Sequence, residues 1–465
     1  MDDHEERKDP SILGEGDLSS EGISDLLKRG NEVEVFECDR SGNVRSKWLH
    51  KPDHTIFSTT HDSSSTYFWL SISAIRQAIY DSFLPVGYPH SVSEDYLAYQ
   101  FYDSLQAFFS TITSLLANRA LLQGLGVGDA NSSATFAMML TILKDAMSRI
   151  ATIVFAHRFG LRIEPDAKRY RFLADLFNDT AFFLELYSPY FGPWGKVVAL
   201  STGEALRALC GVAAGASKAA LSVHFAKHEN LAELNAKEAS QETAVGLVGL
   251  LVGTVVVKFV EGHSAVLYLM VALVFGHLWV NYLGVCCVAM STINRQRATL
   301  IFEQIRKNGT VPSLREVAQK ENILFWKPVL KNQDGTVVGT LSMAESYGQA
   351  LSVPPGGQVR VIDGMGFTLF ANAHAPDGHL DLRILLHTDS TPMQALEAWF
   401  AALEIGLHTK LSNPHAVLAA LHQPKGYAAA SSHAIAQAGW NTETQSLETD
   451  APIRLALRAA HHKEE

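Results

Sequence analysis

The sequence is poor in cysteine and in charged residues. Only four of its 465 residues are cysteines, and no pair has the Cys-x-x-Cys spacing of a zinc or redox site. Charged residues make up 18% of the chain, and the net charge is −10. The first shortage excludes a disulfide framework. The negative net charge and the lack of a lysine- or arginine-rich patch argue against nucleic-acid binding, which needs a basic surface.

The N-terminus has neither the apolar segment of a secretory signal nor the acid-poor composition of a transit peptide. Residues 1–25 are instead rich in aspartate and glutamate. We therefore expect a disordered acidic tail over residues 1–30 and no import into a plastid or mitochondrion by a standard presequence.

The sequence also lacks a recognisable catalytic or nucleotide-binding motif. Gly124–Asp129 (GLGVGD) follows a helical pattern rather than a strand and has no GxGxxG spacing, so a helix end and a loop are expected there. His224 and His228 are four residues apart, but Lys227 lies between them and no HExxH pattern is present. We expect no catalytic site and no metal site.

Two long apolar runs are the most prominent feature that the sequence does contain. Ser264–Thr292 has no charged residue, and Thr243–Val260 has only Lys258, which can reach the membrane interface. The runs predict a membrane-crossing helical hairpin within residues 243–293, with both flanks on the cytoplasmic, stromal or matrix side. The alternative is a large soluble helical core.

Three details refine this interpretation. Gly249-x-x-x-Gly253 permits close helix packing, and the four-residue spacing of His277 and Asn281 predicts that both face the bundle interior. A third run, Val197–Phe225, is interrupted by charges, of which Glu204 and Arg207 are spaced to pair with each other. We expect this third helix to pack against protein rather than to face lipid.

The remaining pattern gives the fold class: mainly α, a membrane-associated helical bundle with a small C-terminal α+β domain. Expected helices cover 95–122, 134–159, 168–186 and 197–225. The expected C-terminal strands are 359–363, 367–374 and 382–388, followed by a helix over Thr391–Leu407. The predicted domains are a hairpin with a linker (31–66), the helical domain (67–306) and the α+β domain (307–465).

Polar residues concentrate in the middle of the helical domain. The four-residue spacing of Arg171, Asp175 and Asp179 predicts that they share one helix face. The group could bind an anion, a metal or a small ligand, or it could be an interhelical salt-bridge network, which buried charges usually form. Its members are Lys144, Asp145, Asp166, Lys168, Arg171, Asp175, Asn178, Asp179 and Glu185.

Four segments in order resemble the root UVB sensitive family: Phe83–Phe108, Ala120–Ala130, Asp166–Leu186 and Asn230–Thr243. The resemblance covers roughly residues 67–306 and implies a membrane-associated eukaryotic protein, with plastid forms among plant members. It also implies links to root ultraviolet-B responses, auxin transport and vitamin B6 homeostasis, and no established catalytic residue. The polar residues of the family-like motifs are Asp103, Gln106, Asn230, Lys237, Gln241 and Glu242.

These observations lead to two hypotheses. The first is a non-enzymatic membrane protein that acts through another root UVB sensitive protein or as a homo-oligomer, because plant members are thought to work as a complex. The second is a small-ligand binding or transport protein that uses the polar cluster 144–185, with a vitamin B6-like or auxin-like ligand. No cofactor is expected, although the cations of the cluster would suit pyridoxal phosphate.

Overall fold

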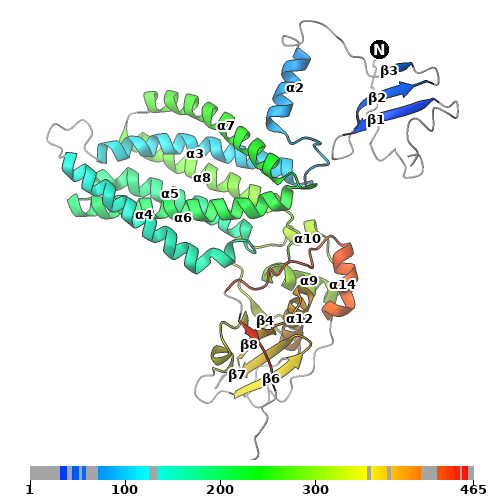
Figure 1. The fold of residues 1–465 in the computed structure, drawn as a ribbon. Helices are drawn as coiled ribbons and strands as arrows, with labels where there is room; N and C mark the ends of the chain where they lie inside the picture. Colours follow the sequence, from blue (N-terminus) through cyan, green and yellow to red (C-terminus); the bar gives the residue numbers. More distant parts are fainter. Residues whose placement is uncertain are drawn as a thin grey trace, which may run out of the picture. The chain divides into compact units, whose positions relative to one another are not determined.

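The computed structural model describes ten segments of the chain: 32–38, 44–51, 55–58, 72–124, 134–260, 262–352, 358–373, 379–409, 427–450 and 453–458. The predicted acidic tail 1–30 lies outside them. The chain divides into two compact units, residues 1–100 with 222–249 and residues 101–221 with 250–465. Helices dominate and a smaller sheet region follows them (Figure 1), which confirms the predicted fold class.

The first unit begins with a three-stranded antiparallel sheet of β1 (Val33–Cys38), β2 (Val44–His50) and β3 (Ile56–Ser58). The predicted hairpin is therefore confirmed, while its turn lies outside the described residues. Helix α2 (Ile72–Phe83) follows. Within the same unit, Phe225 packs against Tyr96 and Tyr99, with ring centroids 5.7 and 5.0 Å apart.

Long helices form the rest of the predicted helical region, and in Figure 1 α3, α4, α5, α6 and α8 run side by side. The polar segment before the first apolar run is the first half of one continuous helix, α7. Leucine, alanine, glutamate, lysine and glutamine favour helix, which explains this continuity. The helices are α3 (Tyr96–Gly124), α4 (Ala134–Ile163), α5 (Ala167–Tyr187), α6 (Pro193–Phe225), α7 (Leu231–Phe259) and α8 (His263–Cys287).

Glycines allow close helix packing on both sides of α3. A methyl group added at Gly253 of α7 would lie 2.5 Å from Leu115 Cδ1, and one at Gly284 of α8 would lie 3.1 Å from Tyr102 Cβ. The close approach predicted for the Gly249-x-x-x-Gly253 motif therefore occurs at Gly253, against α3. In contrast, a methyl group at Gly211 on α6 would have no atom within 4 Å.

The C-terminal part is a mixed sheet with helices. Its strand order is β4-β5-β8-β7-β6, with β9 beside β8; β5 and β9 run parallel to β8, and the other pairs are antiparallel. The three predicted strands are confirmed as β6, β7 and β8, whereas β4 and β5 were missed. The strands are β4 (Val329–Lys331), β5 (Val337–Met343), β6 (Gln358–Gly364), β7 (Phe367–Ala373), β8 (Leu380–His387) and β9 (Arg454–Leu455).

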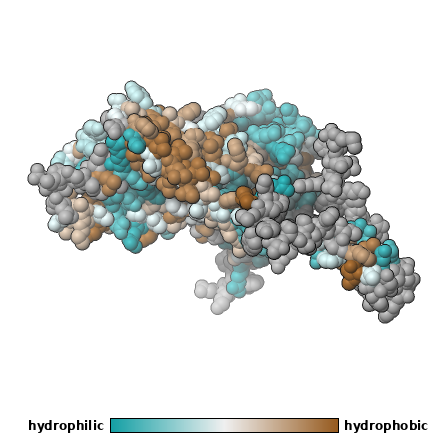
Figure 2. All heavy atoms as spheres, turned by 90° about the horizontal axis from the view of Figure 1, so that it is seen from above, coloured by the Kyte–Doolittle hydropathy of each residue, from teal (hydrophilic) through white to brown (hydrophobic). Residues whose placement is uncertain are grey.

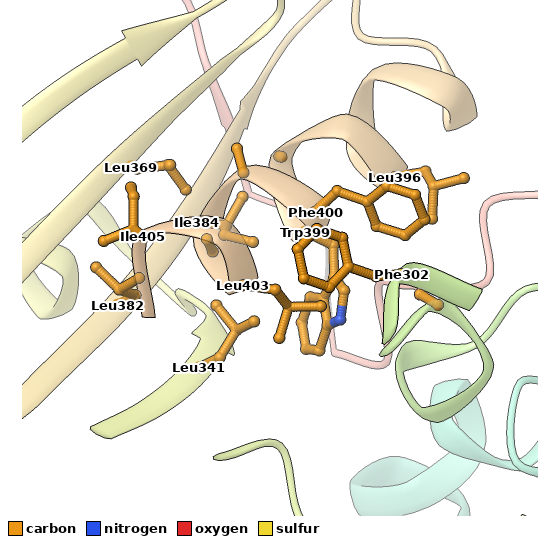
Figure 3. Packing of buried hydrophobic residues seen from close by; sticks show 14 of the residues in the cluster. Phe302, Leu341, Leu369, Leu382, Ile384, Leu396, Trp399, Phe400, Leu403 and Ile405 are labelled. Atoms are coloured by element: carbon orange, nitrogen blue, oxygen red, sulfur yellow. The ribbon is translucent and has the colours of Figure 1, made fainter. Parts of the chain in front are cut away.

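Helix α12 (Pro392–His408) supplies most of the C-terminal core. Figure 3 shows Leu403 and Ile405 of α12 near the sheet residues, whereas Phe400 lies beside Phe302 of a neighbouring helix, with ring centroids 5.3 Å apart. The predicted N-cap is confirmed, because the Thr391 side chain accepts a hydrogen bond from the backbone of Gln394. The other helices here are α9 (Arg295–Asn308), α10 (Leu314–Ala318), α11 (Tyr347–Leu351) and α14 (Tyr427–Gln437).

Among the described residues, three helices are long and apolar enough to cross a membrane: α6, α7 and α8 over Ser264–Cys287. Only 28%, 11% and 33% of their most apolar windows are buried. Helix α6, expected from the sequence to pack against protein, is thus also a candidate span by length and composition, and most of its residues from 197 to 225 are buried or half-buried. Figure 2 shows hydrophobic side chains gathered in a patch on the displayed face of the helical region.

Candidate functional site

The site is built on one face of α5. Arg171, Asp175 and Asp179 share this face, as their four-residue spacing predicted, and all three are buried. The helix begins after Asp166, which occupies the N-cap position. Because charged side chains are rarely buried without partners, the important question is which groups surround these three.

Arg171 is bonded to three groups on α3 and α5. Its Nη2 donates to Asp103 Oδ1 at 2.7 Å and to Gln106 Oε1 at 3.0 Å, and its Nη1 donates to Asp175 Oδ2 at 3.1 Å. Gln106 in turn donates to Asp175. One guanidinium group therefore joins two buried carboxylates on different helices.

Helix α8 contributes two further residues to this network. His277 Nδ1 lies 2.8 Å from Asp179 Oδ2, and Asn281 donates to Asp175. Both residues face the bundle interior, which confirms the prediction, and His277 is fully buried. Among the residues that the structure describes, His277 Nε2 and Asp179 Oδ1 have no hydrogen-bond partner. We call these seven residues the α5 network: Asp103, Gln106, Arg171, Asp175, Asp179, His277 and Asn281.

A second buried group joins the start of α5 to the C-terminal part. Glu321 lies between two cations: it accepts from Lys168 Nζ at 2.6 Å and from Arg297 Nε at 2.7 Å. Asn294, the N-cap of α9, donates to Asp166 Oδ1 at 2.9 Å. The cavity beside this group is about 30 Å³, room for a water molecule but not for an organic ligand.

Burial affects the two carboxylates of this second group differently. Burial raises the pKa of Asp166, although Arg297 and other nearby arginines oppose this shift. Burial also acts to raise the pKa of Glu321, but Arg297 and Lys168 outweigh it and hold that pKa below its ordinary value. Glu321 is thus stabilised as a carboxylate by its two cationic partners.

The other predicted cluster residues lie outside these two groups. Lys144 pairs with Glu204 at 3.1 Å, and Glu185 pairs with Arg207, so the expected pair of Glu204 with Arg207 is wrong. Each member of that pair instead bonds to a different neighbouring helix, because side chains between packed helices can reach across. Asp145 forms an exposed ion pair with Arg149, and Asn178 is half-buried on α5.

The family-like polar residues also divide into two sets. Asp103 and Gln106 belong to the α5 network, and their signal in the sequence is a polar pair three residues apart on an otherwise apolar helix. In the first unit, Asn230, Lys237 and Gln241 each donate to a backbone carbonyl, those of Ser91, Asp81 and Phe83. Two of these bonds hold the last turn of α2 and the third holds the segment after it. Glu242 is half-buried.

His224 and His228, which have the spacing of a metal-binding pair, do not form a shared site. His224 Nε2 lies 3.0 Å from Asp95 Oδ2, whereas His228 is exposed. Within the described segments, no group of three or more histidine, cysteine, aspartate or glutamate side chains could hold a metal ion.

The geometry limits what the predicted cluster can bind. Its three buried or half-buried cations, Lys144, Lys168 and Arg171, are each paired with a carboxylate and lie in three different groups. They do not converge on one phosphate-sized space. The arrangement therefore favours a network that fixes helix packing over an anion site.

Comparisons with known proteins agree with the resemblance found in the motifs. A family model described as the vitamin B6 photo-protection and homoeostasis domain matches residues 69–309. RUS family member 1 of Dictyostelium discoideum is 41% identical over 257 residues, 54% of this chain and 49% of that protein. This chain thus spans about half the length of that relative. A search of solved structures found no match.

Two Arabidopsis thaliana proteins match over more of their length. Protein root UVB sensitive 3 is 28% identical over 383 residues, 80% of this chain and 86% of that protein. Protein root UVB sensitive 2, chloroplastic, is 28% identical over 393 residues, 83% of this chain and 86% of that protein. The similarity to both extends well beyond the region that the family model matches.

Proposed function

Because this chain belongs to the root UVB sensitive family, we propose that it is an integral membrane protein that acts without catalysis, through protein partners, in a process linked to vitamin B6 homeostasis. The observation that carries the proposal is the exposure of its most apolar helices. In the most apolar window of α7, only 11% is buried. A soluble protein rarely exposes so large an apolar surface, whereas a bilayer would cover it.

Helix α8 supports the membrane assignment by the way its residues are sorted. Its polar residues His277 and Asn281 are buried, while the large apolar side chains of Phe275 and Trp279 are 70% and 54% exposed. Polar residues that face the bundle while apolar residues face outward are typical of membrane helices. Such sorting is the reverse of that expected for a helix on a water-exposed surface.

Exposed apolar residues on α4 support binding of a protein partner. Many of its apolar side chains are exposed, including Met139 at 61% and Ile153 at 68%. The same helix exposes the Asp145–Arg149 ion pair, which would be costly against lipid alone. A second chain packed on α4 would cover the apolar residues and shield this pair. We propose that the second chain is another copy or another member of the family.

The pairing of each cation of the predicted cluster with a carboxylate supports a packing role for these residues. The α5 network ties α3, α5 and α8 together by charge-assisted hydrogen bonds. Buried polar groups that bond across helices fix which helices pack together. In this proposal the network is a packing device that keeps the membrane bundle in one arrangement.

Single-cysteine labelling tests the membrane assignment. In a variant with all four native cysteines replaced by alanine, one cysteine is placed at Glu229, before α7, or at Gly262, between α7 and α8. A hairpin that crosses the bilayer puts these two exposed positions on opposite sides. A membrane-impermeant maleimide should then label one of them in sealed vesicles, and both only after detergent is added.

Labelling of both positions in sealed vesicles would contradict the crossing. The partner proposal has a separate readout, the mass of the protein purified in mild detergent from its native membrane. A complex with a second family chain is expected. A single chain in the detergent micelle, with no family member recovered beside it, would refute that part.

A further inference from the structure

A cavity of about 430 Å³ lies in the second unit, beside the predicted polar cluster. It is formed by the end of α4, the first half of α5, α6, the start of α9 and the segment before β4. This volume is within the range of pockets that bind small organic molecules. The α5 network residues do not line it.

One wall of the cavity is aromatic. Phe155, Phe159, Tyr170, Phe177 and Trp326 line it. The ring of Phe155 lies 5.0 Å from that of Phe159 and 6.1 Å from that of Phe177, and Phe155 and Tyr170 are buried. Such mutually packed rings form a preformed surface on which a flat ring can lie.

Cationic side chains also line the cavity. Arg162, Arg169 and Arg295 line the cavity, whereas the nearby carboxylates are those of Asp166, also in the lining, and Asp450. The lining itself therefore has three guanidinium groups and one carboxylate, and Asp450 outside it is paired with Arg162. An anionic ligand would pair with the guanidinium groups that remain.

Two of these arginines have donors available. Arg295 Nε donates to the backbone of Leu447 at 2.8 Å, but its buried Nη2 has no hydrogen-bond partner among the described residues and lies 3.9 Å from Asp450 Oδ2. Arg169 is exposed and forms no ion pair with any described residue. Buried donors without partners are unfavourable, and guanidinium groups bind phosphate and carboxylate through paired hydrogen bonds.

We propose that this cavity binds a small aromatic anion, whose ring lies against Phe155, Phe159 and Tyr170 and whose phosphate or carboxylate is bound by Arg169 and Arg295. Phosphate and carboxylate share this chemistry, and both a free metabolite and a lipid headgroup can supply a phosphate. The described lining contains no lysine, so a ligand with an aldehyde would bind without forming an imine. This inference does not require the helices to cross a membrane.

Pyridoxal 5′-phosphate is a suitable probe because it joins an aromatic ring, a phosphate and an aldehyde. Binding to the full-length protein in detergent is measured by titration calorimetry and compared with pyridoxal, which lacks the phosphate, and with inorganic phosphate, which lacks the ring. We expect pyridoxal 5′-phosphate to bind at least tenfold more tightly than either control, with no imine absorbance. Equal binding of pyridoxal, or an imine band in proportion to binding, would overturn the proposal.

Arg169→Gln is the key variant, because this exposed side chain does not hold the fold together. It should weaken pyridoxal 5′-phosphate binding about tenfold, the loss expected when a charged hydrogen-bond partner is removed. Arg306→Gln, which removes an exposed arginine of α9 outside the cavity, is the matched control and should bind like the natural protein. Equal affinity of both variants would overturn the assignment of the cavity.

A separate experiment tests whether the bound phosphate belongs to a lipid headgroup. The protein is placed in nanodiscs of phosphatidylcholine alone or with phosphatidylglycerol added, and pyridoxal 5′-phosphate binding is measured in each. Unchanged affinity supports the aromatic anion. Loss of binding when the anionic lipid is present would overturn the proposal and reassign the cavity to a lipid headgroup.

Discussion

Replacing Arg171 by methionine should lower the free energy of unfolding by about 3–5 kcal/mol, the cost of breaking a buried ion pair. The structure gives the reason for so large an effect. Arg171 is bonded to Asp103 at 2.7 Å and Asp175 at 3.1 Å, and both carboxylates are only 6% exposed. Without the guanidinium group, two buried carboxylates on different helices lose their shared cationic partner.

The assay is thermal unfolding of the purified protein in detergent. At about 1.4 °C per kcal/mol for a unit of more than 300 residues, the loss corresponds to a fall in Tm of about 4–7 °C. Arg171→Met, Asp103→Asn and the double variant form a cycle, and a coupling energy of about 0.5–3 kcal/mol is expected. The control is Lys47→Met, which removes the exposed ion pair with Glu34 and should change stability by less than about 1 kcal/mol.

Two results would refute this reasoning. If Arg171→Met melts at the same temperature as the natural protein, the α5 network does not fix the helix packing. If the two single variants lose stability additively, Arg171 and Asp103 do not act as a pair. Either result would reopen the interpretation of these residues as a ligand site.

Three further predictions use the same unfolding assay. Gly253→Ile should cost about 1–3 kcal/mol because it overpacks the contact with α3, whereas Gly211→Ile on the open face of α6 should be tolerated. Trp399→Ala should cost about 3–5 kcal/mol because its side chain is fully buried, and Val361→Ala at an exposed site should cost far less. Because the folded-state pKa of Glu321 is lowered, its stabilisation is present at neutral pH and is lost as the pH falls through that lowered value. The difference in Tm between the natural protein and Glu321→Gln should therefore shrink between about pH 7 and about pH 3, and a constant difference would contradict it.

Features set by neighbouring residues could be predicted from the sequence. The helical period of the apolar residues predicted α3, α4, α5 and α6. Four-residue spacings predicted that Arg171 and Asp175 share a helix face and that His277 faces the bundle interior. These predictions succeeded because side chains four apart on a helix share a face in any tertiary context. The continuity of α7 could also have been predicted, since its polar first half consists largely of good helix formers.

Partners between distant segments could not be predicted. Lys168 binds Glu321, which is 153 residues away, and Glu204 binds Lys144 rather than the nearby Arg207. Such pairs depend on how helices are aligned against one another, which no local pattern specifies. The cavity was missed for the same reason, because its arginines come from the ends of α4, α5 and α9.

The central claim, that α6, α7 and α8 hold the protein in a bilayer, is tested most directly by alkaline carbonate extraction of native membranes. Carbonate at high pH strips proteins that are bound only by charge or by other proteins, whereas helices that cross the bilayer remain. We predict that the full-length chain stays entirely in the membrane pellet and is released only by detergent. Complete release into the supernatant would contradict the account.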